Sequence, residues 1–207
     1  MALSNYQLVL LDNLIYLGIF EKLAQEPETK TIIVRDVIHE LLDENAIVDY
    51  WKDELKEDQS DDNPGQAMMN IDEWRALLQA ISDDDTLCSM TISHVVDADT
   101  DPDRKNTNFR AACFSSDDET VIVFRGTHGA YTWNDNGEAA TMIASNSQLE
   151  ALEYVDQIGA ELSTKGTITV TGHSKGGNLA QFITICANNL VIDRCLSLDG
   201  QGFSMVA

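Results

Sequence analysis

One segment constrains the fold of this chain more than any other, because it joins a strand-like run to a helix-like run through glycines. The apolar and β-branched residues 167–170 predict a buried strand, and residues 178–190 predict a helix. The pattern G-x-S-x-G stands between them at residues 172–176, with Ser174 at its centre. A chain that turns this abruptly from strand into helix crowds the positions two residues either side of the centre, so glycine is needed at both.

The hydroxyl of Ser174 would then stand at the end of a strand and at the start of a helix. Backbone N–H groups at a helix start can stabilise a developing oxyanion. This context predicts a nucleophile elbow. A glycine-rich turn that only packs, or that holds a phosphate, is the alternative interpretation of the same five residues.

The charge of the chain excludes several classes of partner. Its 207 residues include 13 Lys and Arg against 35 Asp and Glu, which gives a formal net charge of −22. An acidic surface of this kind repels phosphate backbones and anionic lipids, so we expect no nucleic-acid partner. The longest apolar stretch, residues 8–20, is too short to span a bilayer, and residues 1–7 lack the positive charge of a secretory signal. We therefore expect no membrane span and a cytoplasmic location.

Three zones with different periodicity follow one another along the chain. Residues 1–83 predict helices, residues 87–126 predict strands with a hairpin, and residues 127–207 alternate helix, strand, helix and strand. Such an alternation implies parallel strands with right-handed crossovers. We expect one structural domain of the α/β class, with a mostly parallel sheet of about four to six strands flanked by helices. Residues 1–83 would form a helical N-terminal segment packed on a core built from residues 84–207.

A second segment with possible chemistry is the end of the strand-like run over residues 120–124, which passes into Arg125-Gly126-Thr127. Gly126 permits an unusual exit from a strand, so the N–H and hydroxyl of Thr127 can form half of an oxyanion hole. An ordinary turn after a strand would show the same residues.

The two segments together resemble the class 3 lipase-like branch of the α/β-hydrolases, and more closely the bacterial Mbeg1-like family. That family shows R-G-T-D, then W-K-E-D, then G-H-S-K-G-G-N-L-A, then F-D-G-P-G-F. This chain has R-G-T-H from residue 125, W-N-D from residue 133, the full G-H-S-K-G-G-N-L-A from residue 172 and L-D-G-Q-G-F from residue 198. The resemblance implies an α/β-hydrolase-like fold, with Ser174 as the nucleophile and the N–H groups of Thr127 and Lys175 as oxyanion donors.

The chain departs from the family pattern where a catalytic base is needed. His128 stands where the family prefers Asp, and Gln201 stands where it prefers Pro. Hydrolases of this kind place the triad acid and histidine after the strand that follows the elbow, yet the chain ends soon after Leu198. A serine hydroxyl is a poor nucleophile without an adjacent base. His128 is the candidate surrogate base, and a loop or surface histidine is the other interpretation.

The remaining candidates offer weaker signals. His173 precedes Ser174, and adjacent side chains in such a turn diverge, so we interpret it as structural. His39 falls on a predicted helix and His94 on a predicted strand, and the sequence suggests a partner for neither. Asp199 ends the last strand and is either a turn residue or an acid near the site.

No cofactor and no metal is expected. Residues 97–103 place carboxylates at alternating positions, as calcium loops do. An EF-hand needs Gly at the sixth position and Glu at the twelfth, where this chain has Pro102 and Asn108. We interpret the segment as a solvated acidic loop. Zinc-ligand spacings and the glycine loops that bind dinucleotides or nucleotide phosphates do not occur.

The most direct functional hypothesis is a lipase- or esterase-like serine hydrolase, which would cleave a small carboxylic ester through an acyl-enzyme on Ser174. Its base and acid would come from outside these 207 residues, so this chain would be inactive or very weak, and whether it is an enzyme stays open. The alternative is a non-catalytic hydrolase-like protein that binds a partner through the pocket or an open sheet edge. The strand over residues 195–198 would form that edge and allow a homodimer. A third hypothesis is an anion-binding module that uses the elbow amides.

Overall fold

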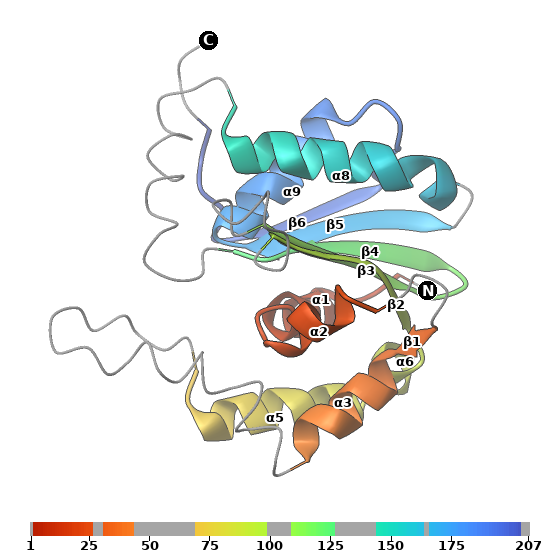
Figure 1. The fold of residues 1–207 in the computed structure, drawn as a ribbon, viewed down its shortest axis with the longest axis vertical. Helices are drawn as coiled ribbons and strands as arrows, with labels where there is room; N and C mark the ends of the chain where they lie inside the picture. Colours follow the sequence, from red (N-terminus) through yellow and green to blue (C-terminus); the bar gives the residue numbers. More distant parts are fainter. Residues whose placement is uncertain are drawn as a thin grey trace, which may run out of the picture.

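A computed structural model describes most of the chain, and Figure 1 shows its arrangement. The described residues are 2–26, 31–43, 69–98, 109–126, 144–163 and 166–203. Within them the chain forms seven helices and one six-stranded sheet of order β1-β2-β3-β4-β5-β6. Among these helices, none combines the length and the hydropathy that crossing a bilayer requires.

The sheet is mixed, so the expectation of a mostly parallel sheet is wrong. Three neighbouring pairs, from β1 to β4, are antiparallel, whereas β4–β5 and β5–β6 are parallel. The hairpin between β3 and β4 explains part of the difference, because a tight turn can join only antiparallel neighbours. Parallel pairing needs a crossover, and here helices supply it. The strands are β1 (Ile32–Ile33), β2 (Thr91–Asp97), β3 (Arg110–Ser115), β4 (Glu119–Phe124), β5 (Thr167–His173) and β6 (Arg194–Leu198).

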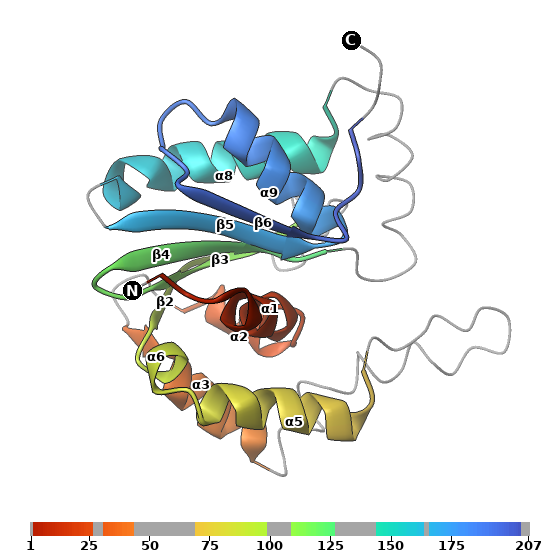
Figure 2. The ribbon, with the colours of Figure 1, turned by 180° about the vertical axis from the view of Figure 1, so that it is seen from behind.

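Helices cover both faces of the sheet in layers (Figures 1 and 2). One face carries α8 (Asn146–Leu162) and α9 (Lys175–Cys186). The opposite face carries α1 and α2, and a further layer of helices packs outside them. The remaining helices are α1 (Asn5–Leu14), α2 (Ile19–Leu23), α3 (Val34–Leu42), α5 (Ile71–Ser82) and α6 (Asp85–Cys88).

Helix α1 lies between the sheet and α5, and this position explains its composition. Ser4 and Gln7 form a reciprocal capping box that starts the helix. Leu8, Leu11 and Leu14 are fully buried, because the helix has the sheet on one side and the outer helices on the other. A helix that is apolar on most sides is stable in water only when it is covered in this way.

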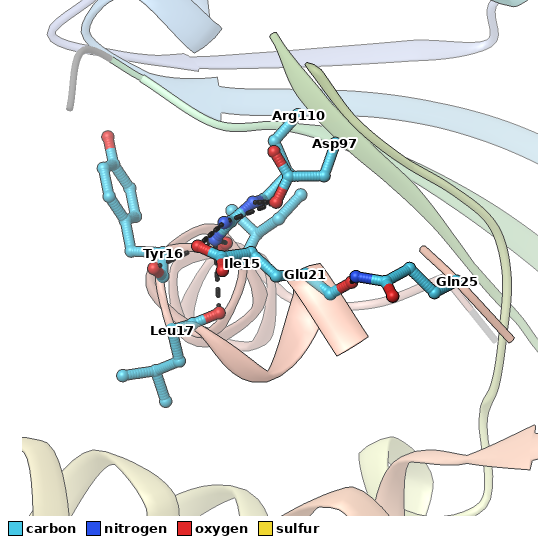
Figure 3. A network of polar contacts seen from close by, with 7 residues as sticks. All are labelled: Ile15, Tyr16, Leu17, Glu21, Gln25, Asp97 and Arg110. Atoms are coloured by element: carbon cyan, nitrogen blue, oxygen red, sulfur yellow. Dashed lines mark hydrogen bonds and ion pairs between the residues drawn. The ribbon is translucent and has the colours of Figure 1, made fainter. Parts of the chain in front are cut away.

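A buried arginine fixes the end of α1 against the sheet (Figure 3). Arg110 of β3 donates from Nη1 to the carbonyl oxygens of Ile15, Tyr16 and Leu17 at 3.1, 3.1 and 3.2 Å. These carbonyls follow the helix, where a positive charge is favoured. The Nη2 of Arg110 also lies 2.6 Å from Oδ2 of Asp97, whose side chain is fully buried. Asp97 is therefore not part of a solvated loop, and residues 99–103 lie outside the described residues.

Candidate active site

Ser174 occupies the junction between β5 and α9 with a backbone conformation that few side chains adopt. Its φ is 54° and its ψ is −120°. The junction is held from both sides, because the Ser174 N–H donates to the Leu198 carbonyl at 2.8 Å and the Ser174 carbonyl accepts from the Asn178 N–H at 3.1 Å. A strained residue of this kind persists only where its surroundings fix it. Strand β5, the strained residue and helix α9 follow one another in the order that the sequence pattern predicts.

The two glycines of the motif are required by close backbone contacts. A Cβ atom at Gly172 would lie 2.4 Å from the carbonyl carbon of Gly176 and 2.7 Å from the Phe124 oxygen. A Cβ atom at Gly176 would lie 2.1 Å from the same Phe124 oxygen. The start of α9 therefore packs directly on the end of β4. This is the crowding that the sequence pattern implies.

The structure describes one of the two expected oxyanion donors, Lys175. Lys175 is the first residue of α9 and is 6% exposed. Its N–H belongs to the first turn of α9. Thr127 and His128 lie outside the described residues. Gly126 is the last described residue before them. It lies beside His173, the residue that precedes Ser174, because a Cβ atom at Gly126 would approach the His173 carbonyl oxygen to 2.4 Å.

Tyr16 reaches the same place from the opposite layer, and sequence reasoning missed it. Its hydroxyl lies 3.4 Å from Nδ1 of His173 and would contact a Cβ atom at Gly126. The side chain is buried, at 2% exposure. In the sequence Tyr16 is one aromatic residue within an apolar run, so no local signal separates it from an ordinary core residue.

A buried carboxyl group lies one helical turn before Tyr16, and it was also missed. Oδ2 of Asp12 accepts a hydrogen bond of 2.7 Å from the Thr171 hydroxyl. Burial raises the pKa of Asp12 from 3.8 to about 8, although the Thr171 hydrogen bond lowers it in part. Oδ1 of Asp12 is buried and forms no hydrogen bond within the described part of the chain. Asp12 and Tyr16 share a face of the helical turn, so both meet the α1 side of β5.

The asparagine of the motif organises the segment that follows β6. Asn178 of α9 is buried, and its Nδ2 donates to the Gln201 carbonyl at 3.0 Å. Its Oδ1 accepts from Nε2 of Gln148 at the start of α8, at 2.7 Å. Asn178 thus ties the first turn of α8 to the stretch around Gln201. It positions both segments near Ser174, which stands four residues before it.

The other candidate residues lie in different surroundings. Asp199 follows β6, is exposed and has a φ of 47°, so it stands at the carboxyl end of the strand next to β5. His39 is exposed on α3, and His94 lies on β2, three strands from β5. Within the ranges that the structure describes, no histidine forms a hydrogen bond with Ser174.

Comparisons with known proteins give one family and one solved structure. The Mbeg1-like family model matches residues 81–206. No curated protein is significantly similar in sequence. A fungal lipase, solved as a lipase–inhibitor complex in a study of interfacial activation, is 16% identical with a TM-score of 0.37. The match covers 53% of this chain and 43% of the lipase chain, so the chain spans less than half the length of that protein.

Proposed function

Because the chain belongs to the Mbeg1-like family, whose model covers more than half of it, we propose that it is a lipase- or esterase-like serine hydrolase. The observation that carries the proposal is the backbone of Ser174, with φ 54° and ψ −120° between a buried strand and a helix. In a nucleophile elbow, such a conformation presents the serine hydroxyl at the strand end, near the first N–H groups of the following helix. Strained residues of this kind cluster at functional sites, which favours a functional role for Ser174.

The reaction would proceed in two steps through an acyl-enzyme. Oγ of Ser174 attacks the ester carbonyl carbon while a base takes its proton, and the carbonyl oxygen becomes an oxyanion. The N–H of Lys175, with that of Thr127, would hold this oxyanion. The alcohol leaves with the proton. Water then attacks the acyl carbon with the help of the same base, and the carboxylic acid is released from the regenerated serine.

The catalytic base that takes the proton of Ser174 has two candidate sources. One is His128, which stands four residues after the end of β4 in the sequence. The other is a histidine outside these 207 residues. A serine without its base retains only a small fraction of the activity of a complete triad. We therefore expect slow ester turnover by this chain unless His128 serves.

The test measures labelling by a fluorophosphonate probe together with hydrolysis of p-nitrophenyl butyrate. Ser174→Ala removes the nucleophile, and Ser163→Ala is the matched control, because Ser163 is exposed at the end of α8. We expect the probe to label the wild type and Ser163→Ala, but not Ser174→Ala. Fast turnover that His128→Ala abolishes would assign the base to His128. Equal labelling of Ser174→Ala and wild type would refute the proposal.

A second function, partner binding without catalysis, is favoured by the open edge of the sheet. Strand β6 is the last strand of the described sheet and is half-exposed along its length. Ile185 on α9 and Val191 before β6 are 73% and 78% exposed. Among the described residues no strand pairs with the outer edge of β6, and a strand edge of this kind near apolar side chains suits a second chain, including a second copy of this one. An unreactive Ser174 in a stable dimer would favour this function over hydrolysis.

A further inference from the structure

The hydroxyl of Tyr16 lies between the two strand ends that lead to the expected oxyanion donors. A Cβ atom at Gly126, two residues after β4, would lie 2.2 Å from the Tyr16 hydroxyl oxygen. The same oxygen lies 3.4 Å from Nδ1 of His173, the last residue of β5. In the sequence, Thr127 follows Gly126, and Lys175 stands two residues after His173. One side-chain oxygen therefore contacts both segments just before their expected donors.

This hydroxyl packs tightly against the ends of β4 and β5. Phe124 of β4 pairs with Gly172 of β5 in parallel register, so the two strands end side by side. A Cβ atom at Gly126 would also lie 2.4 Å from the His173 carbonyl oxygen. The Tyr16 hydroxyl thus occupies the space that a side chain at position 126 would need. The separation of the two strand ends depends on this contact, because close-packed atoms leave little room for adjustment.

The turn that carries Tyr16 is also fixed to β4 through its backbone. The Tyr16 N–H donates to the Asn13 carbonyl at 3.1 Å, and the Tyr16 carbonyl accepts from Nη1 of Arg110 at 3.1 Å. The Arg110 carbonyl in turn accepts from the N–H of Arg125 at 3.0 Å. Figure 3 shows the Tyr16 side chain extending away from the guanidinium of Arg110. Because its backbone is held in this way, the ring presents its hydroxyl from a defined position.

A second polar contact holds the same helical turn against β5. Thr171 and His173 lie on one face of the strand, because alternate strand residues share a face. Oδ2 of Asp12 accepts from the Thr171 hydroxyl at 2.7 Å, and Tyr16, four residues after Asp12, meets His173. Both Asp12 and Tyr16 are buried. Two successive contacts fix the place of Tyr16 along the strand more firmly than one would.

We infer that Tyr16 is a positioning residue, whose hydroxyl sets the separation of the N–H groups of Thr127 and Lys175. This inference rests on the serine hydrolase function proposed above. Tyr16 acts through the residues that precede these donors. An oxyanion hole works only when its donors lie at hydrogen-bond distance from the same oxygen. A displacement of about 1 Å can cost on the order of a hundredfold in rate.

The rate at which a fluorophosphonate probe labels Ser174 tests the inference, because the phosphonyl oxygen takes the place of the ester oxyanion. Tyr16→Phe keeps the buried ring and removes only the hydroxyl. We expect the limiting rate to fall by about tenfold or more, with the half-saturating probe concentration unchanged, because the donors act mainly on the transition state. Tyr6→Phe makes the same change at a 62% exposed position on α1 and should be labelled as wild type.

A second control separates misplaced donors from a general loss of stability. Thr120→Val also removes one buried hydroxyl, which lies 3.0 Å from the Ser115 hydroxyl at the opposite end of β4 from Gly126. This variant should be labelled at the wild-type rate. In two-dimensional amide spectra, Tyr16→Phe should shift the signals of Gly126 and Lys175. Thr120→Val should leave both signals in place.

Gly126→Ala tests the contact from the other side. Its methyl group would meet both the Tyr16 hydroxyl and the His173 carbonyl oxygen, so labelling of Ser174 should slow. The same substitution should cost less in the Tyr16→Phe background, where one of these two atoms is absent. An equal cost in both backgrounds would overturn the inferred contact.

The outcomes separate this role from the hydrolase function itself. Absence of labelling at Ser174 in the wild type would refute the hydrolase, and the role of Tyr16 with it. Wild-type labelling matched in rate by Tyr16→Phe would overturn the role of Tyr16 alone. An equal loss of rate in Thr120→Val, or unchanged Gly126 and Lys175 signals in Tyr16→Phe, would overturn it as well.

Discussion

The carboxyl group of Asp12 in α1 accepts a hydrogen bond of 2.7 Å from the hydroxyl of Thr171 in β5, three residues before Ser174. The two residues lie 159 positions apart in the sequence. Both are almost fully buried, at 1% and 0% exposure. One polar contact inside an apolar layer therefore links the N-terminal helix to the strand that carries the candidate nucleophile.

Asp12 should make the stability of the protein depend on pH. Its folded-state pKa of about 8 exceeds its ordinary value of 3.8, so between these values the folded chain holds a proton that the unfolded chain has released. This proton contributes to the free energy of unfolding. Its contribution is complete below about pH 4, and it falls by about 1.4 kcal/mol per pH unit until it is lost at about pH 8. Asp12→Asn cannot ionise, so its stability relative to wild type should increase from pH 5 to pH 8.

Urea denaturation at pH 5, 6.5 and 8 measures this difference. Asp72→Asn provides the control, because Asp72 is exposed on α5. A gap between Asp12→Asn and wild type that stays constant with pH would contradict the raised pKa. The gap for Asp72→Asn should vary little over the same range.

Removal of the buried guanidinium should destabilise the fold strongly. Arg110→Met leaves the Asp97 carboxylate buried without its partner at 2.6 Å, and it removes the hydrogen bonds to the carbonyls that follow α1. We expect a loss of about 3 to 5 kcal/mol in the free energy of unfolding. Arg75→Met, at an exposed position on α5, should change it by less than about 0.5 kcal/mol. Similar losses in the free energy of unfolding for both variants would mean that the contacts of Arg110 stabilise the fold no more than an exposed arginine does.

The glycine contacts predict a sharp difference between two substitutions. Gly176→Ala would bring a Cβ atom to 2.1 Å from the Phe124 oxygen, whereas Gly202→Ala would meet nothing within 4 Å. Gly176→Ala should cost about 1 to 3 kcal/mol of stability and should abolish probe labelling of Ser174, because α9 must move away from β4. Gly202→Ala should behave as wild type in thermal unfolding and in labelling. Normal labelling of Gly176→Ala would show that this packing is not needed to place the serine.

The homodimer expected at the β6 edge can be tested without disturbing the core. The double variant Ile185→Lys, Val191→Lys places charge on two exposed apolar positions, one in the last turn of α9 and one three residues before β6. We expect light scattering after size exclusion to show a dimer for wild type and a monomer for this variant. Leu149→Lys is the control, because it places the same charge at a 53% exposed apolar position on α8. This variant should remain dimeric. A monomeric wild type would contradict the prediction.

Local sequence patterns predicted the elements around Ser174 because the necessary information is local there. The run over residues 167–170 is apolar and β-branched, and the glycines at 172 and 176 are required by contacts within the turn and with β4. The hairpin between β3 and β4 was predictable for the same reason, since turn residues separate two strand-like runs. The parallel pairing of β5 with β6 also followed from the helix between them.

The sequence alone therefore determined the strand, turn and helix that hold Ser174, together with the family resemblance that its motif carries. Tertiary structure decided the mixed sheet, the burial of Asp12, the placement of Tyr16 beside His173 and the strained His94. The physical reason is that a buried polar group depends on a partner brought to it by packing. Thr171 lies 159 residues from Asp12, and no periodicity along the chain predicts their contact.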